Sequence, residues 1–520
     1  MKKLFERRPS VLLAGTFLFS FLLAVGIPNE LGRPFSLPVT LGICAALAVP
    51  LLLSLFFLFR FRPGGMELMQ KPLPSGKWLV LGLAACYVPA FLILCPGTFA
   101  YDVPFQLRQF FVGPYSDHHP ILHTLFMGAF IGFGKLIGQV NVGAILYTLI
   151  QILLLSGCFV RCVQSIGEQC GTRTALFSYL FFALYPLHML MAGTATKDTL
   201  FSGTFALSLC LIYQKMRFGV HNRENGRMIL AIVFSILLRN NAVYAYLPWS
   251  VLGLILLRKE KRKTALAVFM STLLATGIGA GLKGGFNATS GSVVEKLSVP
   301  IQQMARVRLM RPEALSEEQK AGIDALMPGE AWQKYDATIS DPVKFETDGE
   351  AIRADMPGFF RLYLSVLVKC PDLCMDAFLD LTHAFLYPYQ TYRVSGRYLQ
   401  TEISDEYYDD WWTGEKIHDM SLFPKARQAV SWRFGAKGAM QWPIGYLFNM
   451  GVLVWLCLFL ALRRMYLDEK GSAYVTVLPL LLLGTYLLGP CMTGRYVYPF
   501  VCILPILAGG SKAQAPADGE

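Results

Sequence analysis

Residues 10–26 read SVLLAGTFLFSFLLAVG, a run that contains no charged side chain. Similar apolar runs recur along the whole chain, at residues 38–59, 78–95, 141–160, 174–192, 199–214, 264–282, 443–462, 472–489 and 497–510. A helix needs about 20 such residues to cross the hydrocarbon of a bilayer, and most of these runs approach that length. Of the 520 residues, 54% are hydrophobic and only 16% are charged, a composition typical of membrane proteins rather than soluble enzymes.

The stretch 228–257 adds two short apolar segments, separated at RNNAVYAYLP (residues 239–248). With this pair, the sequence predicts an α-helical polytopic membrane protein of about twelve transmembrane helices. The first run follows a basic start but lacks a small-residue cleavage site, so we expect an uncleaved first span rather than a signal peptide.

The net charge of +12 is unevenly distributed. Lysine and arginine concentrate in the loops at residues 1–9, 60–77, 161–173, 215–227, 258–263 and 463–471, with RKEKRK (258–263) the densest cluster. Because cytoplasmic loops are rich in these residues, this set is predicted to be cytoplasmic. Membrane orientation therefore accounts for the basic charge, and no nucleic-acid partner is predicted. The assignment requires that residues 120–138 do not cross the membrane.

The sequence divides into four parts. Residues 1–284 form a predicted N-terminal transmembrane module, whose first outer loop is 96–140. Residues 285–440 are mildly acidic and contain helical patterns, which predicts a mostly helical extracytoplasmic domain, since so long a loop is seldom a simple connector. Residues 441–510 hold the C-terminal transmembrane helices, and residues 511–520 are a predicted disordered tail.

Several charged residues adjoin the apolar runs, where charge is costly and usually functional. The topology places all of them on the outer face; they are Asp102, Asp117, His118, His119, Lys197, Asp198, Arg239, Arg495 and the neighbouring Tyr496. A carboxylate such as Asp102 can take a proton from a hydroxyl group. The basic residues can hold a phosphate, and Asp117 with His118 can bind a divalent cation such as Mg²⁺ or Mn²⁺.

Each of these residues also has a simpler explanation. Asp102 can cap the helix that follows it, and Lys197 with Asp198 can be a solvated pair at the end of a span. Arg495 can extend its guanidinium to the membrane surface, with the tyrosines beside it acting as interface anchors. The predicted gathering of all these residues on one face favours a functional site.

The stretch from YDVPFQ (101–106) to HHPILHTLFMGAFIGFGKLIG (118–138) resembles the start of GT-C glycosyltransferases. That superfamily includes protein O-mannosyltransferases, oligosaccharyltransferase subunits and the aminoarabinose transferase of lipid A. YPLHMLMAGTATKDTLF (185–201) resembles a later segment of many members. Across most of residues 90–500 the chain is also similar to a group of uncharacterised bacterial membrane proteins, through LRNN (238–241), SVPIQQMARV (298–307) and GRYVYP (494–499).

The resemblance implies a GT-C architecture in the bacterial plasma membrane, with an active site on the extracytoplasmic face. Asp102 would be the catalytic base, Asp117, His118 and His119 would lie near the donor phosphate or a metal, and Lys197, Asp198 and Arg495 would contact phosphate or sugar. Many members have two adjacent acids in the first loop, whereas this chain has one, which leaves the base and the metal requirement open.

These inferences predict a membrane glycosyltransferase that moves a sugar, with presumed inversion at the anomeric carbon, from a polyprenyl-phosphate donor to an envelope glycan, lipid or protein. No Walker-type or Rossmann glycine motif is present, and a donor reached from the bilayer requires none. Three alternatives remain open: a transporter or flippase of lipid-linked saccharides, a glycan polymerase or ligase of another fold, and a non-catalytic envelope assembly protein. Only the enzyme readings require a carboxylate at position 102.

Overall fold

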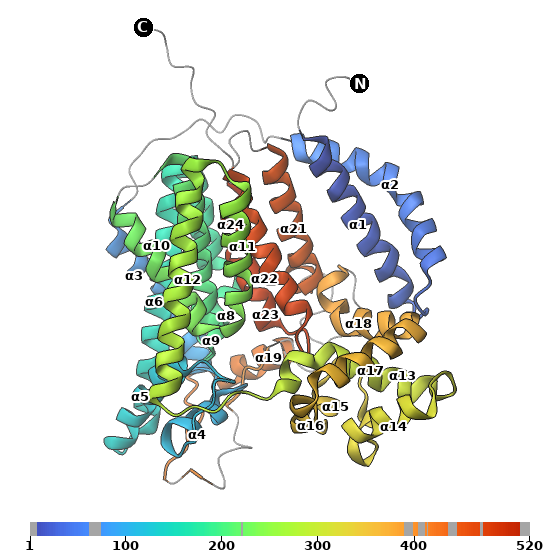
Figure 1. Ribbon diagram of the computed structural model, residues 1–520. Helices are drawn as coiled ribbons and strands as arrows, with labels where there is room; N and C mark the ends of the chain where they lie inside the picture. Colours follow the sequence, from blue (N-terminus) through green and yellow to red (C-terminus); the bar gives the residue numbers. More distant parts are fainter. Residues whose placement is uncertain are drawn as a thin grey trace.

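The computed structural model describes residues 8–61, 74–219, 222–388, 399–403, 411–412, 414–434, 445–467 and 472–509. Over these residues the chain is helical, and its only β pairing is a few isolated bridges. Figure 1 shows a bundle of long helices with a group of shorter helices at one end. The tail at 511–520, predicted to be disordered, lies outside the described residues.

Six helices among the described residues are long and apolar enough to cross a membrane. They are α1 (Pro9–Glu30), α2 (Leu37–Arg60), α3 (Gly76–Leu94), α6 (Val140–Cys170), α12 (Lys259–Gly285) and α21 (Met450–Leu467). A seventh span is formed if α7 (Thr172–Leu184) and α8 (Pro186–Ala192), which meet at 57°, are counted together. The bend falls at Pro186, because proline cannot donate the backbone hydrogen bond that would continue α7. These helices confirm the prediction of an α-helical membrane protein.

The remaining bundle helices are shorter or more polar. They are α9 (Lys197–Phe218), α10 (Asn222–Leu238), α11 (Val243–Leu256), α22 (Val477–Leu487), α23 (Gly494–Cys502) and α24 (Leu504–Ala508). The predicted interruption of 228–257 is confirmed, since α10 and α11 are separated by a short 3₁₀ turn at Asn240–Ala242. Trp249, Phe205 and Val501 belong to the single large apolar core that these helices share.

Two helices of the first predicted outer loop lie at one end of the bundle, namely α4 (Val103–Phe111) and α5 (Ile121–Leu136). The 16 residues of α5 pack along the start of α6, at this end of the bundle rather than through it. Gly143 permits this packing, because a Cβ atom there would lie 2.3 Å from the carbonyl oxygen of Phe130. The glycine-rich stretch 120–138 thus forms a short helix packed against a long one.

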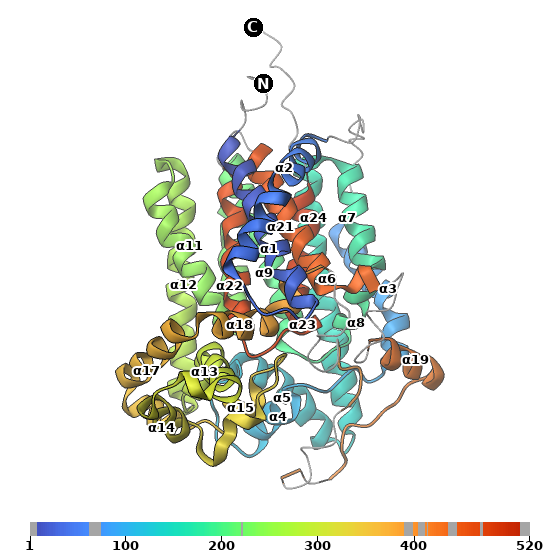
Figure 2. The same ribbon diagram turned by 90° about the vertical axis from the view of Figure 1, so that its right-hand side faces the viewer.

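We call α13 to α18 the cap. Its helices are α13 (Ser298–Met310), α14 (Glu317–Leu326), α15 (Asp341–Lys344), α16 (Gly349–Ala354), α17 (Met356–Lys369) and α18 (Pro371–Leu386). Local signals start some of them: Ser316 and Gln319 form a capping box at α14, and the Asp355 side chain accepts the Gly358 amide at α17. The cap has an apolar core of its own and lies at the same end of the bundle as α4 and α5 (Figure 2).

Several contacts fasten the cap to the bundle, among them two from the end of α1 and the loop after it. The Asn29 amide of α1 donates to the Asp380 carboxylate at 2.7 Å, and the backbone amide of Phe35 donates to Asp376 at 2.7 Å. Beyond the cap, the chain forms α19 (Pro424–Phe434) and the short α20 (Gly445–Phe448) before it returns to the bundle in α21.

Candidate functional site

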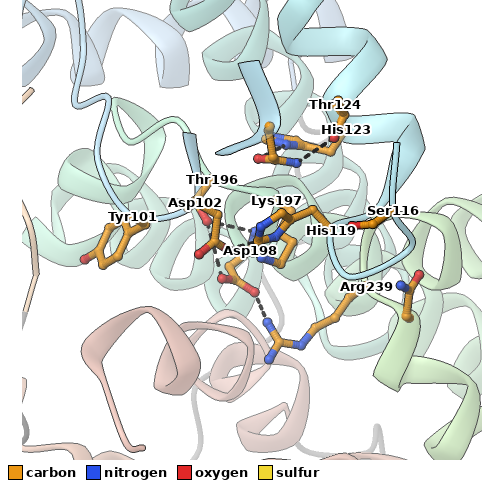
Figure 3. Close-up of polar contacts among 12 residues, drawn as sticks. Tyr101, Asp102, Ser116, His119, His123, Thr124, Thr196, Lys197, Asp198 and Arg239 are labelled. Carbon is orange, nitrogen blue, oxygen red and sulfur yellow. Dashed lines mark hydrogen bonds and ion pairs between the residues drawn. The ribbon is translucent and has the colours of Figure 1, made fainter. Parts of the chain in front are cut away.

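Asp102 stands at the start of α4, but its side chain does not cap that helix. The carboxylate instead accepts hydrogen bonds from Lys197 and, at 3.3 Å, from Nη1 of Arg495. Nδ1 of His119 lies 3.8 Å from the same carboxylate oxygen. The capping explanation is therefore wrong, and residues far apart in the sequence converge on Asp102 (Figure 3).

Backbone pairing brings the Asp102 loop to the segment that precedes α9. The Thr98 amide donates to the Gly193 carbonyl at 2.8 Å, and the Ala195 amide donates to the Thr98 carbonyl at 2.8 Å. Gly97 allows this approach, because its φ of +132° is rare for other residues and a Cβ atom would lie 2.9 Å from the Gly193 oxygen. The pairing sets Asp102 opposite the first turn of α9.

Lys197 and Asp198 do not pair with each other. Lys197 points to Asp102, whereas Asp198 is fully buried and forms an ion pair with Arg239, at the break between α10 and α11. Nε of Arg495 lies 3.8 Å from the Asp198 carboxylate and so links the two pairs. Lys197 and Asp198 are therefore not a solvated pair at the end of a span. The Arg495 side chain is only 11% exposed, so it is not extended to the surface.

Aromatic rings surround the two arginines. The guanidinium of Arg239 lies over the rings of Tyr486 at 4.3 Å and Tyr496 at 4.8 Å. Arg495 lies over Tyr101 at 4.4 Å and donates to the Tyr496 hydroxyl at 3.3 Å. Because an aromatic face attracts a cation without neutralising it, these contacts hold the arginines in place and leave their charge available.

The cluster carries an excess of positive charge. Among the residues that the structure describes, the cations Lys197, Arg239 and Arg495 face two carboxylates, Asp102 and Asp198, which leaves one net positive charge. Nδ1 of His119 and Nε of both arginines are buried and have no hydrogen-bond partner within the described part of the chain. Buried donors are normally satisfied, so the arrangement is complementary to an anion.

Two pKa values define the protonation state on the solvent side of this cluster. Burial raises the pKa of Asp102, but Arg495 and Lys197 together outweigh burial and hold that pKa well below its usual range. Burial is the main cause that lowers the pKa of His119 to about 3. At neutral pH, Asp102 is therefore a carboxylate and His119 is uncharged.

The low pKa of His119 predicts a loss of stability in mild acid. The pKa is lower in the folded than in the unfolded chain, so between about pH 6.5 and 3 the unfolded chain binds the additional proton. His119 should therefore lower the free energy of unfolding by about 1.4 kcal/mol per pH unit as the pH drops through this range. Thermal unfolding in detergent from pH 7.5 to 4.5 should show a shallower slope for His119→Gln than for the native protein.

The control for this experiment is His418→Gln, since that imidazole is 58% exposed and lies outside the cluster. Equal slopes for the native protein and His119→Gln would contradict the proposed neutral, buried state of His119.

Asp117 and His118 do not join the cluster. The Asp117 carboxylate accepts hydrogen bonds from Lys283 of α12 at 2.7 Å and from the Gly291 amide at 2.6 Å. The His118 ring contacts that of His119 edge to face, at 4.4 Å. Asp117 thus ties the first outer loop to the end of α12, beside the site.

These contacts do not favour a metal at Asp117 and His118. Both oxygens of Asp117 already have partners, and the Lys283 ammonium would repel a divalent cation there. Within the described ranges, no three histidine, cysteine, aspartate or glutamate side chains gather closely enough to hold an ion. The predicted divalent cation therefore stays a prediction, and the mechanism below assigns it no step.

The sequence did not single out some residues of the site. Tyr101 and Tyr486 hold the arginines, and Lys283 binds Asp117. The fully buried His123 bonds to Gln106 of α4 at 3.1 Å and to Tyr147 of α6 at 2.9 Å, and so joins the helix that begins after Asp102 to the bundle. The one signal for His123 in the sequence was a polar residue within an apolar stretch. Polar residues with a purely structural role give the same signal.

Comparison with known proteins identifies a family but no activity. No curated protein and no solved structure matches the chain. A family match covers more than half of the sequence and includes His119, Lys197, Asp198, Arg239 and Arg495, while Asp102 precedes its first residue. From residue 114 to residue 516, the chain belongs to the family described as "Family of unknown function (DUF6020)".

Proposed function

We propose that this protein is a membrane glycosyltransferase that moves a sugar from a polyprenyl-phosphate donor to a hydroxyl group of an envelope acceptor. The observation that carries the proposal is the position of the Asp102 carboxylate, next to the cations Lys197 and Arg495 and the neutral His119. Transfer from a phosphate-linked sugar requires a proton acceptor and an anion site close together, and this cluster supplies both.

The proposed donor site consists of Lys197, Arg239 and Arg495. Their excess positive charge suits a phosphate, and the unpartnered Nε atoms of the arginines supply additional donors. The membrane location suits a donor whose polyprenyl chain lies in the bilayer and whose phosphate reaches the end of the bundle. His119 can add one neutral hydrogen bond without repelling the sugar.

In the proposed reaction, the acceptor oxygen attacks the anomeric carbon and its proton passes to Asp102. The bond from that carbon to the phosphate oxygen breaks, and polyprenyl phosphate leaves with the electron pair. Without donor, Lys197 and Arg495 hold Asp102 in its ionised form. A bound phosphate shares these cations with Asp102, which makes the carboxylate a stronger base for the incoming hydroxyl.

The proposal also includes the finer topology. Counting α9, α10, α11, α22 and the joined α23 and α24 with the seven spans gives about twelve passes. The start of α1, which follows the first of the basic loops predicted to be cytoplasmic, lies at the end of the bundle opposite the cap (Figure 1), and this supports an extracytoplasmic position for the cap and the site. The proposal therefore includes the GT-C architecture that the sequence resembles and a location in a bacterial plasma membrane.

Removal of one cation tests the donor site without requiring the acceptor. Lys197→Gln cancels the net positive charge of the cluster, so binding of a polyprenyl-phosphate hexose should weaken by about 10- to 100-fold. The measurement is a titration of the labelled donor into protein reconstituted in lipid nanodiscs. Lys320→Gln is the matched control, since this lysine pairs with Glu317 on the surface of the cap.

Equal donor affinities of the native protein and Lys197→Gln would reject the cluster as the phosphate site. Tight donor binding without transfer, together with movement of the labelled saccharide across a sealed vesicle, would favour a flippase.

The predicted cation is tested with the same reconstituted protein, which is assayed for transfer with EDTA and then with added Mg²⁺ or Mn²⁺.

A further inference from the structure

Helix α19 and the segment that leads into it expose large apolar side chains, although neither belongs to a predicted span. Leu422 is 64% exposed, Phe423 is 53% exposed and Trp432 is 64% exposed. Lys425 of the same helix is exposed as well. Three large apolar side chains beside a lysine are unusual on a surface that faces only water.

Backbone hydrogen bonds fix the position of this surface relative to the membrane. The Leu422 amide donates to the Leu92 carbonyl at 3.1 Å, and the Met420 amide donates to the Cys95 carbonyl at 2.9 Å. Leu92 lies in the last turn of α3, a candidate span, and Cys95 follows that helix directly. Figure 2 shows α19 beneath the end of α3. The exposed side chains therefore lie where a span leaves the hydrocarbon.

We propose that Leu422, Phe423 and Trp432 insert into the phospholipid surface at the cap end of the bundle, so that α19 is an interfacial helix. Tryptophan and phenylalanine suit the boundary between headgroups and acyl chains, and Lys425 lies close enough along the helix to meet lipid phosphates. A bilayer already surrounds the neighbouring α3, so this contact extends an existing lipid-facing surface. The sequence predicted an extracytoplasmic domain at 285–440 and no lipid contact within it.

The interfacial helix is connected to the candidate site. Nη2 of Arg427 donates to the Thr401 carbonyl at 3.2 Å, and the Leu399 amide donates to the Phe434 carbonyl at 3.0 Å. Between these anchors, Gln400 exchanges two hydrogen bonds with Tyr101, one from the Tyr101 amide at 2.8 Å and one to the Tyr101 hydroxyl at 2.7 Å. Insertion of α19 in the lipid thus holds Gln400 against the residue that precedes Asp102.

Site-specific photocrosslinking in nanodiscs tests the lipid contact. A benzophenone amino acid replaces Phe423 in one variant and Phe345 in the control, because Phe345 is a phenylalanine that is even more exposed, at 68% against 53%. Phe345 follows α15, which lies further from the spans than α19 does (Figure 2). Phospholipid adducts at position 423 should exceed those at position 345 by about tenfold or more.

Equal adduct yields at the two positions, or crosslinks from position 423 to a protein instead of to lipid, would overturn the proposal.

Hydrogen exchange then tests the connection to the site. Phe423→Gln/Trp432→Gln should speed exchange of the Leu399 and Gln400 amides by about tenfold, and native protein moved from nanodiscs to detergent should change in the same direction. Unchanged exchange in both experiments would refute the connection. Neither measurement depends on transferase activity.

Discussion

Replacement of Asp102 by asparagine is expected to lower sugar transfer by about 10²- to 10⁴-fold while the protein stays in the membrane. Asparagine keeps the shape of the side chain but cannot accept the proton of the acceptor hydroxyl. Asp102 is well placed for this role, because it is the carboxylate of the cluster that lies close to two cations and a neutral imidazole. Its side chain is also 22% exposed, so an acceptor can reach it. The measurement is transfer of label from polyprenyl-phosphate hexoses to an envelope extract.

The control for this experiment is Asp372→Asn, which removes a carboxylate that pairs with Arg311 at 2.8 Å in the cap. The control should transfer sugar at the native rate. Membrane levels and donor binding should be measured for both variants, because the substitution at position 102 leaves Lys197 and Arg495 with less compensating charge. Native transfer by Asp102→Asn would eliminate this carboxylate as the base.

Replacement of Asp198 by alanine is expected to lower the free energy of unfolding by about 3–5 kcal/mol. Asp198 has no exposed surface, and its partner Arg239 is only 9% exposed, so the substitution leaves a buried cation without its anion. The stability should be measured by thermal unfolding in one detergent. Glu346→Ala is the control, because the pair of Glu346 with Lys334 is exposed and should contribute about 1 kcal/mol or less.

A double substitution separates loss of the pair from loss of packing. Asp198→Leu with Arg239→Met removes both charges together, and stability should return to near the native value. The double variant should nevertheless bind the donor more weakly than the native protein, since one phosphate-holding cation is gone. If Asp198→Ala destabilised no more than Glu346→Ala, the buried pair would not be a structural centre of the site.

Local composition was sufficient to predict that the chain is an α-helical membrane protein and where several of its long helices lie. The apolar run 141–160 lies within α6, and the polar break at residues 239–241 separates α10 from α11. Such elements are predictable because each residue contributes its own preference for lipid or water, and the preferences add along the chain. Where packing decides the outcome, composition was less informative, as in α5, whose apolar sequence forms a short helix against α6.

The charged members of the site were also predictable, but their partners were not. Lys197 and Asp198 stand out because ionised groups near a membrane core are costly. Nothing in their adjacency indicates that Lys197 pairs with Asp102 and Asp198 with Arg239. Asp117 and His119 are two residues apart, yet one binds Lys283 and the other faces Asp102.

By itself, the sequence determined that this is a helical membrane protein with a set of charged residues that hydrocarbon would not tolerate. Both properties follow from the solvation of individual side chains, which requires no knowledge of neighbours. Only the tertiary structure decided that Asp102, Lys197, Asp198, Arg239 and Arg495 form one cluster with an excess of positive charge. Ion pairing depends on distances of a few ångströms between distant segments, and the pairing of Thr98 with Gly193 and Ala195 and the packing of the helices set those distances.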